Sequence, residues 1–520
     1  MSELIRINAN GGDPHRQAND ALAALAEANK GTKPRVMIHG NAIVRLTGSS
    51  ELESLSVNSM VDELSAVAQF EKGSDDNISP VVPPDRVAKI LLDRDVKDLA
   101  GLQTVTRVTE VPVFVPGEDR PKLVAQPGLD PSGVYYVPAT GLEDLRPPEV
   151  GQITTEDLDD AIDLLFGSEG LFCDFGFDDA ASKAHALALC VLPFVRDLIP
   201  GPTPLLVVRA PDVGSGKTEL VKAALYPGCG RVETGTGTDN SEEWRKKVTA
   251  CLLAADPVIF LDNLAATLDS GAIAAVLTAE TWKDRILGKS QMATLPIRSI
   301  WAATGNNLSL SPELARRSYG VFLDPYADGY SKKPADRSRD DYKHPDLIGW
   351  AEAERIRIVG AVLTLIAHWA EGPAQVEGGY LFLRSGDAPE ESSLTKGSFE
   401  RWAAVVGGVL EAAHFAGFLR NDERLRSEAD DASRGKVEFF AAWGEHLGME
   451  QMVYKALLEE CKDPVSPVRE SLPLELYAMR PDDLAVKLAT WLRDHQGQRS
   501  DEYELVKHEG RPTRWSLRAV

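Results

Sequence analysis

The segment LLVVRAPDVGSGKTELVKAAL, residues 205–225, decides the fold class of this chain. Its apolar start is typical of a short buried strand, and a helix is expected to open at the lysine. Between the two lies Gly214-Ser215-Gly216-Lys217-Thr218, where glycines let successive backbone N–H groups turn inward and face phosphates at a helix N-terminus. The order strand, glycine-rich loop and helix predicts an α/β fold with a P-loop core and a parallel sheet.

This loop also predicts the residues that bind ATP and Mg²⁺. Lys217 would reach the β- and γ-phosphates, and the Thr218 hydroxyl would hold Mg²⁺. Nucleotide binding is assigned to six consecutive residues: Gly214, Ser215, Gly216, Lys217, Thr218 and Glu219. The pattern G-x4-G-K-[ST] would place glycine at position 211, where this chain has Pro211. A chance glycine-rich turn is the alternative, but the flanking strand and helix favour phosphate binding.

A second apolar run, residues 258–261, ends in Asp262-Asn263. An aspartate at such a strand end, about 40 residues after the loop, is placed to bind Mg²⁺ through water. Asp262 is therefore a metal and catalytic candidate. Asn263 stands where many P-loop motors carry an acid that orients the attacking water. An amide can position water but accepts a proton poorly, so Asn263 is a catalytic candidate that leaves the base unassigned.

Another carboxylate could supply that function, and the run SEEWRKK offers two. Glu242 and Glu243 are the candidates, and we assign a catalytic role to Glu243. The alternative is that both glutamates form the solvated start of a helix, with Lys246 and Lys247 as partners on its surface.

A third apolar strand, residues 300–303, is followed by Asn306, an amide that could contact the γ-phosphate or the attacking water. Arg316 and Arg317 directly precede a further strand, residues 320–323. An arginine in this place could reach the nucleotide of a neighbouring subunit and stabilise charge in phosphoryl transfer. The alternative is an ordinary surface pair of arginines.

Between the second and third strands, residues 283–298 (KDRILGKSQMATLPIR) are expected to form a hairpin with Gly288-Lys289 at its tip. Four basic side chains stand against the single acid of this segment, and they are Lys283, Arg285, Lys289 and Arg298. In a ring, such a tip would point into the channel and meet the phosphates of DNA. We assign DNA contact to Lys289 and Arg285. The alternative is a solvated turn.

Length and composition bound the remaining possibilities. A chain of 520 residues exceeds one hydrophobic core, so three or more domains are expected. The net charge of −23 argues against indiscriminate coating of nucleic acid but leaves room for a basic channel. The five cysteines form no C-x-x-C pair, which indicates neither a disulfide framework nor a zinc site. No apolar run of about 18 residues and no secretory leader are evident, so a cytoplasmic protein without a membrane span is expected.

Changes in composition divide the chain into five segments. They are a mixed α/β domain over 1–150, a helical lead-in over 151–203, the P-loop core over 204–325, a linker and helical lid over 326–421, and a C-terminal domain over 437–520. The charged stretch 422–436 is expected to be a joint. In the last domain a helix over 481–492 precedes a hairpin, which suggests a winged-helix-like end. Four hairpin residues could touch the DNA backbone: Lys507, His508, Arg511 and Arg514.

Taken together, these motifs resemble the AAA+ and superfamily 3 ring ATPases. The chain is most similar to the helicase-like ATPases of phages and integrated mobile elements, which are related to the ATPase module of primase-helicases. The resemblance covers roughly residues 160–420 and is carried by the ordered set APDVGSGKT, FLDNL, LTAETWKDRILGKS and WAATGNNLSLSPELARRS. It implies a sensor role for Asn306, a finger role for Arg317 or Arg316, and a DNA-contacting hairpin at Lys289. Residues 1–150 show no primase active-site motif.

The resemblance implies an ATP-driven DNA helicase or translocase for the replication of a phage or mobile element. Its subunits would associate head-to-tail into a ring of six, act on single-stranded or forked DNA, and work with a possible primase or polymerase partner. Two alternatives remain. One is a DNA-remodelling ATPase, such as a helicase loader or packaging motor, that separates no strands. The other is a nucleotide-gated assembly protein with little turnover, which Asn263 favours.

Overall fold

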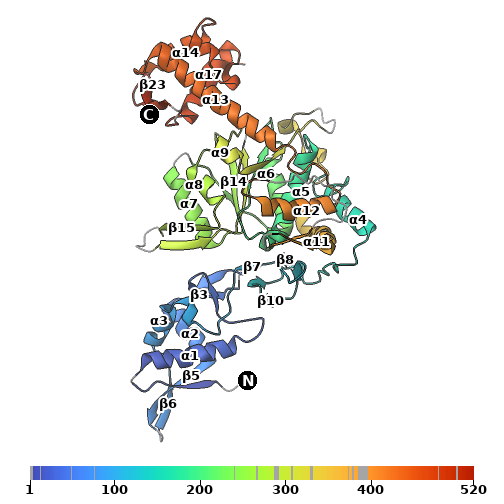
Figure 1. Cartoon of the computed structure of the whole chain (residues 1–520), viewed down its shortest axis with the longest axis vertical. Helices are drawn as coiled ribbons and strands as arrows, with labels where there is room; N and C mark the ends of the chain where they lie inside the picture. Colours follow the sequence, from blue (N-terminus) through green and yellow to red (C-terminus); the bar gives the residue numbers. More distant parts are fainter. Residues whose placement is uncertain are drawn as a thin grey trace.

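The computed structural model describes the whole chain except residues 1–3, 12, 49, 75–76, 239–240, 265–266, 286–291, 306–307, 328–331, 373, 378–379, 384–395, 478, 499 and 501. The protein is elongated, with the N-terminal part at one end, a central α/β body, and the C-terminal part at the other end (Figure 1). Among the described helices, none is both long and apolar enough to cross a membrane.

A five-stranded parallel sheet forms the centre of the body. Its strands in spatial order are β13 (Thr234–Gly235), β14 (Val258–Leu264), β17 (Ile300–Gly305), β12 (Leu205–Arg209) and β18 (Ser318–Phe322). The apolar runs recognised in the sequence are the inner strands of this sheet, because strands buried on both faces read as continuous hydrophobic segments. The prediction of an α/β fold with a parallel sheet is confirmed. Since the strands are parallel, the residues that follow them gather at one edge.

Two hydrophobic clusters cover the two faces of this sheet. On one face, Leu206 and Val208 of β12 pack into a cluster with α4, α5, α6, α10, α11 and α12. On the other face, Leu205 and Val207 pack with α7, α8, α9 and the start of α13. The helices of the first face are α4 (Thr155–Phe166), α5 (Ala180–Val195), α6 (Lys217–Cys229), α10 (Leu347–Ala353), α11 (Arg355–Glu371) and α12 (Glu400–Ala412). Those of the second face are α7 (Ser241–Ala254), α8 (Gly271–Val276), α9 (Pro312–Ala315) and α13 (Asp422–Leu447).

The charged stretch 422–436, which the sequence predicts to be a joint, is a helical connection between the central body and the C-terminal part. It forms the first half of α13, a continuous helix of 26 residues. Its charges pair at helical spacing, as in Arg424 with Glu428, so the charge run is a solvated helix face. On the opposite side, Leu425 and Ala429 are buried against the sheet cluster. Composition alone shows the many charges. It does not show that Leu425 and Ala429, four positions apart, lie on one buried side of a helix.

The N-terminal part contains three helices and several small sheets. The helices are α1 (Pro14–Ala28), α2 (Val57–Val67) and α3 (Asp85–Leu92). The strands are β1 (Ile5–Asn8), β2 (Met37–His39), β3 (Ala42–Leu46), β4 (Leu52–Ser54), β5 (Ala68–Ser74), β6 (Asn77–Val81), β7 (Arg107–Thr109), β8 (Val113–Val115), β9 (Lys122–Val124), β10 (Gly128–Leu129) and β11 (Val134–Tyr136). Residues between Val111 and Leu142 join the large cluster of the central body, so the end of this part packs on that body.

The C-terminal part has its own core, to which α13 contributes Phe439, Phe440 and Trp443. Its elements are β21 (Met452–Val453), α14 (Tyr454–Lys462), α15 (Pro467–Glu470), α16 (Leu474–Tyr477), α17 (Pro481–Asp494), β22 (Tyr503–His508) and β23 (Arg514–Ala519). The strands form an antiparallel sheet in the order β21-β23-β22. The expected helix followed by a hairpin is present, and the winged-helix assignment stays a prediction.

Candidate active site

The loop between β12 and α6 has the backbone that phosphate binding requires. Gly214 and Gly216 have φ values of 81° and 79°, in the left-handed region where glycine is favoured. A Cβ atom on Gly216 would also lie 3.0 Å from the ring of Phe175. No side chain caps the N-terminus of α6, which begins at Lys217. The first N–H groups of this helix therefore lack a side-chain acceptor and can serve an anion.

Lys217 is held inside this loop. Its side chain is buried, and its Nζ donates to the carbonyl oxygen of Asp212 at 3.1 Å. The hydroxyl of Ser215 donates to the same carbonyl at 2.5 Å. Burial lowers the pKa of Lys217, while the negative charges of Asp212 and Asp262 oppose that shift. A desolvated ammonium group of this kind gains stability from an additional anion, which a phosphate chain would supply.

The carboxyl edge of the sheet brings three side chains together. The hydroxyl of Thr218 donates to Oδ1 of Asp262 at 2.8 Å, and the hydroxyl of Thr304 donates to the same oxygen at 2.5 Å. These residues come from the loop–helix junction, the end of β14 and the end of β17. A hydroxyl and a carboxylate beside a phosphate loop are the oxygen ligands that Mg²⁺ takes together with phosphates and water. The side chains present therefore fit the metal that the sequence predicts.

Thr304 is a site residue that sequence reasoning missed. It is 1% exposed, and besides Asp262 it contacts the backbone N–H of Asn263, which donates to its hydroxyl at 3.0 Å. The available signal was a threonine at the end of β17, a buried strand that lies beside the strand carrying Asp262 in the sheet. The neighbouring candidate Asn306 lies outside the described residues.

Asn263 has an unusual backbone. Its φ is 53°, in the left-handed region, and the register of β14 against β17 shifts between Leu261 and Leu264. Asparagine tolerates this conformation better than most residues that carry a side chain. The conformation gives a physical reason for an asparagine after Asp262 that is independent of proton transfer. The side chain itself is exposed.

The two glutamates in the predicted site lie on helix surfaces. Glu243 is exposed in the first turn of α7, with Oε1 2.8 Å from Nζ of Lys246. Glu219 is exposed in the first turn of α6, with Oε1 3.5 Å from Nζ of Lys222. These placements agree with the alternative of a solvated helix start, and the catalytic role of Glu243 stays a prediction.

Arg316 and Arg317 lie at the opposite edge of the sheet from the phosphate loop. The backbone N–H of Leu205, the first residue of β12, donates to the carbonyl of Arg317 at 2.9 Å. The length of β12, about 16 Å for five residues, separates that edge from the loop. Arg317 is also bound locally, because its guanidinium lies 3.2 Å from the carboxylate of Glu313. Arg316 is exposed. Within one subunit neither arginine is near the phosphate loop.

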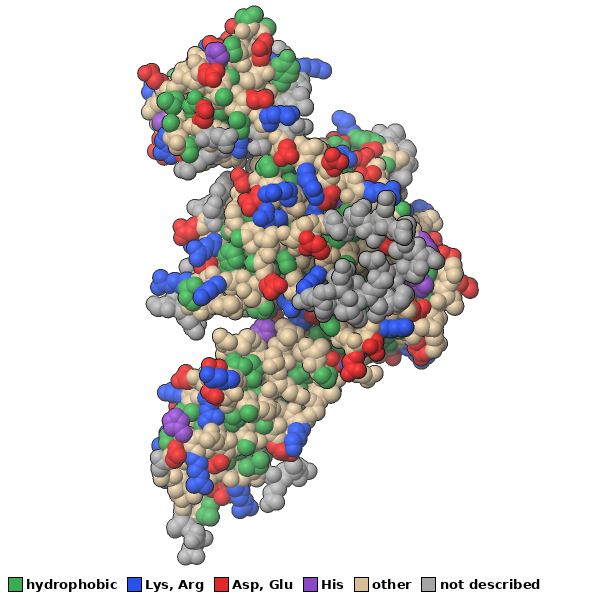
Figure 2. All heavy atoms as spheres, in the orientation of Figure 1, with side chains coloured by type: hydrophobic (Ala, Val, Ile, Leu, Met, Phe, Trp, Pro, Cys, Tyr) green, Lys and Arg blue, Asp and Glu red, His purple; other side chains and the backbone are tan. Residues whose placement is uncertain are grey.

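The predicted hairpin consists of β15 (Thr281–Arg285) and β16 (Met292–Pro296). Arg285 is exposed at the end of β15, and Lys289 with the expected tip lies outside the described residues. In Figure 1 the hairpin projects from the side of the central body, and Figure 2 shows Lys and Arg side chains at this projecting end.

This hairpin is fastened to α7 by a buried carboxylate, Asp284 of β15. Arg245 donates to Asp284 from Nε at 3.0 Å and from Nη2 at 2.5 Å, and Thr249 donates to it at 2.7 Å. Trp282 of β15 donates to the hydroxyl of Thr249 at 2.9 Å. Burial raises the pKa of the Asp284 carboxyl, but the bonds from Arg245 and Thr249 outweigh it and hold the pKa below its ordinary value. The one acid of the basic hairpin is thus paired with α7.

The polar segment after β18 contacts the phosphate loop. The hydroxyl of Tyr326 donates to Oδ2 of Asp212 at 2.9 Å. Pro334 is buried, and a Cβ atom added to Gly214 would lie 3.7 Å from the Cβ of Pro334. The sequence predicts only a linker for the start of the segment 326–421, because proline and charged residues predominate there.

Comparisons with known proteins give little beyond this geometry. No protein-family model matches the chain. A search of curated proteins finds no significant match. Among solved structures, the chain is similar to "The X-ray structure of JCV Helicase", with 14% sequence identity, coverage of 62% of this chain and 74% of that chain, and a TM-score of 0.20. A TM-score of this size does not indicate a shared fold, so the function is inferred from the side chains described above.

Replacing Thr304 by valine is expected to lower the rate of ATP hydrolysis about 10- to 100-fold, as removal of groups that orient metal ligands commonly does. Valine keeps the volume and the β-branch but loses the hydrogen bonds to Asp262 and Asn263. Steady-state turnover and ATP affinity, measured on the same samples, check this. Turnover equal to that of the wild type would contradict a role for Thr304. The matched control is Thr278→Val, just after α8, where the hydroxyl donates to the carbonyl of Ala274.

Proposed function

We propose that this chain is a Mg²⁺-dependent ATPase of the AAA+ type that forms a ring and acts on DNA as a helicase or translocase. The observation that carries the proposal is the meeting of Thr218, Asp262 and Thr304 at the carboxyl edge of the parallel sheet, beside the buried Lys217. Each of these groups has a direct use in the hydrolysis of a nucleoside triphosphate. They come from the start of α6, from β14 and from β17, which only the folded sheet brings together.

In this reaction water attacks the γ-phosphorus, the bond to the β–γ bridging oxygen breaks, and ADP and phosphate leave. Lys217 and the free N–H groups of α6 would bind the phosphates, and Thr218 and Asp262 would hold Mg²⁺. When bound, Mg²⁺ neutralises charge on the phosphate oxygens. Thr304 fixes the orientation of the Asp262 carboxylate by donating to its Oδ1, and this carboxylate would hold Mg²⁺. Asn263, Asn306 and Glu243 are the candidates for positioning the water.

The DNA-directed part of the proposal rests on the hairpin β15–β16. It is a projecting pair of strands with exposed Lys283 and Arg285, anchored to α7 through Asp284. Exposed cations on an anchored projection suit the phosphate backbone of single-stranded DNA. Arg316 and Arg317 are remote from the phosphate loop of their own subunit. In a head-to-tail ring they would instead contact the nucleotide of the neighbouring subunit. Such a ring would belong to the replication machinery of a phage or mobile element, with a primase or polymerase as possible partner.

A second candidate function is a nucleotide-gated assembly protein. Asn263 favours it, because an asparagine in the left-handed conformation stands where many P-loop motors carry an acid. In addition, the carboxylate of Glu243 is paired with Lys246. The third candidate, a helicase loader or packaging motor, shares the ATPase site but separates no strands.

Steady-state ATP hydrolysis with and without single-stranded DNA, alongside unwinding of a forked duplex, tests the proposal. DNA-stimulated hydrolysis with unwinding is the expected result. Stimulation without unwinding would favour the loader or packaging motor. ATP binding without turnover under any DNA condition would overturn the helicase proposal and favour the assembly protein.

Replacing Asp284 by asparagine is expected to reduce the DNA-stimulated part of turnover by at least about fivefold, the low end of coupling between sites, with little change in basal turnover. The amide removes the ion pair with Arg245 while preserving the shape of the side chain, so the hairpin can move independently of α7. The control is Glu280→Gln, an exposed carboxylate just before β15. Equal DNA stimulation in both variants would contradict the anchoring role.

A further inference from the structure

Arg209 is a buried cation directly before the phosphate loop. It is the last residue of β12, and its side chain is 13% exposed. Its Nη1 donates to Oε2 of Glu428, on the second turn of α13, whereas its Nε is buried without a hydrogen-bond acceptor. Burial lowers the pKa of Arg209, and the carboxylate of Glu428 opposes that shift. The buried charge therefore depends on a carboxylate that lies 219 residues further along the chain.

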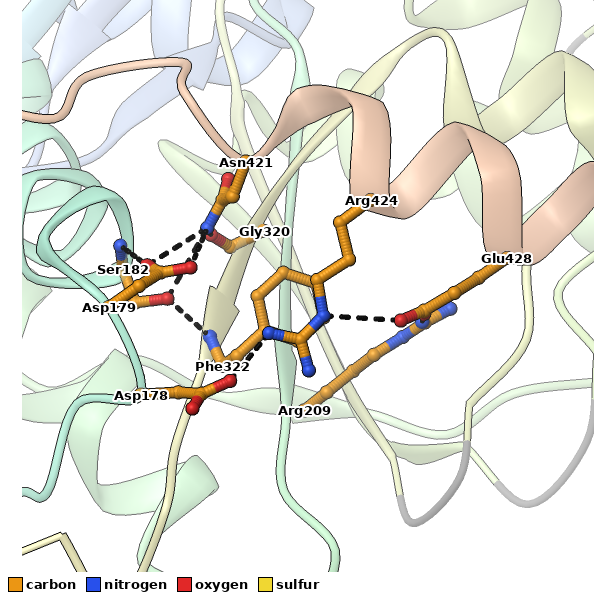
Figure 3. A network of polar contacts seen from close by, with 9 residues as sticks. All are labelled: Asp178, Asp179, Ser182, Arg209, Gly320, Phe322, Asn421, Arg424 and Glu428. Carbon is orange, nitrogen blue, oxygen red and sulfur yellow. Dashed lines mark hydrogen bonds and ion pairs between the residues drawn. The ribbon is translucent and has the colours of Figure 1, made fainter.

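Glu428 is shared with a second arginine of α13. Nε of Arg424 donates to Oε1 of Glu428 at 3.2 Å, and its Nη1 donates to Oδ2 of Asp178 at 2.5 Å. The guanidinium of Arg424 also lies 3.9 Å from the ring centroid of Phe322, which is the β18 partner of Arg209. Figure 3 shows these residues converging from β12, β18 and the segment before α5 onto the start of α13.

The first residues of α13 are held to the sheet by further buried contacts. The side-chain nitrogen of Asn421 donates to the carbonyl of Gly320 at 3.3 Å and to Oγ of Ser182 at 3.4 Å. Lys396, which is 1% exposed, forms an ion pair with Asp422. The start of α13 is therefore attached to β18 and, through Arg209 and Glu428, to β12, the strand that leads into the phosphate loop.

The other end of the same helix is the core of the C-terminal part. With 26 residues, α13 is about 39 Å long, and its Phe439 and Trp443 are fully buried in the C-terminal cluster. In a continuous helix packed into a core at each end, a small rotation of the first turns beside Arg209 would become a larger displacement at Trp443. The contacts join the nucleotide site to the C-terminal part through one rigid element.

We propose that Arg209, through Glu428 and Arg424, is a positioning residue that couples the state of the phosphate loop to the C-terminal domain by way of α13. The inference rests on the proposed nucleotide binding. ATP would reshape the loop after Arg209, shift its guanidinium, and reorient α13. Because coupling between two sites is reciprocal, a ligand on the C-terminal domain would change the affinity for ATP by the same factor.

Hydrogen exchange of the full chain, with and without a slowly hydrolysed ATP analogue and Mg²⁺, tests this proposal. In the wild type, the analogue is expected to slow exchange in residues 422–430 by about fivefold or more, the low end of coupling between sites. Glu428→Gln should lose that response while its affinity for the analogue, measured by titration, stays within about threefold of wild type. The control Glu438→Gln alters the exposed pair with Arg434 on the same helix and should respond as the wild type does.

A role in folding alone would raise exchange along α13 equally with and without the analogue, leaving the nucleotide response intact, and would overturn the coupling. The pair of substitutions Arg209→Met and Glu428→Met, made together, leaves no unpaired buried charge and should also abolish the response. A wild type that binds the analogue but shows no change over 422–430 would overturn the coupling and leave the proposed function standing. A wild type that does not bind the analogue at all would overturn both, and the titration separates these cases.

Discussion

Replacing Lys217 by alanine is expected to weaken ATP binding by more than about 100-fold, because each hydrogen bond to a charged group contributes about 1.5–3 kcal/mol and this ammonium would meet two phosphates. The fold should survive, since the substitution removes a desolvated charge that donates to a backbone carbonyl, that of Asp212, and not to a side chain of the core. Titration with Mg²⁺–ATP gives the affinity, and thermal unfolding shows that the sheet is intact.

The matched control is Lys222→Ala. Lys222 lies on the same helix and pairs with Glu219 at the surface, so its removal should leave the affinity for ATP nearly unchanged. Tight ATP binding by Lys217→Ala would contradict the assignment of the loop as a phosphate site. Weak binding by both lysine variants would indicate a general loss of positive charge around α6 and would contradict a specific role for Lys217.

The local part of this site could be predicted from sequence because its signals are local. A buried parallel strand reads as a continuous apolar run, and the glycines at 214 and 216 mark a backbone that few other residues adopt. The strand, the loop and the helix were therefore recognisable together. Asp262 was recognisable for the same reason, since it ends the next long apolar run.

The partners of these residues could not be predicted, because contacts between distant positions leave no local pattern. Thr304 bonds to Asp262 across 42 residues, and Arg209 bonds to Glu428 across 219. The charged residues of α13 illustrate the same difficulty. Their composition indicates a joint but not that the joint is a helix, in which Leu425 and Ala429 are buried on one side. The sequence thus predicts contacts between residues that are close in the chain. It does not predict the hydrogen bonds that the sheet forms between residues far apart in the chain.

Replacing Arg316 by alanine is expected to reduce the rate of ATP hydrolysis about 10³-fold, the lower range for loss of an arginine finger, while ATP binding is retained. The physical reason is position. Arg316 is exposed at the edge of the sheet opposite the phosphate loop, so in the proposed ring it would contact the nucleotide of a neighbouring subunit. Arg317→Ala is the matched comparison, because Arg317 is held by Glu313 within its own subunit. A larger loss of turnover with Arg317→Ala would assign the finger to Arg317 instead.

Mixing two inactive variants distinguishes action on a neighbour from action within the subunit. Asp262→Ala subunits retain the arginine, and Arg316→Ala subunits retain the metal site. In a ring assembled at random from equal amounts, about one interface in four joins an intact site to an intact arginine. Mixed samples should therefore recover up to about a quarter of wild-type turnover, whereas each variant alone stays inactive. A mixture as inactive as its components would mean that the arginine acts within its own subunit. Since the whole of β12 lies between Arg317 and the loop of that subunit, such a result would require a change of the central sheet itself.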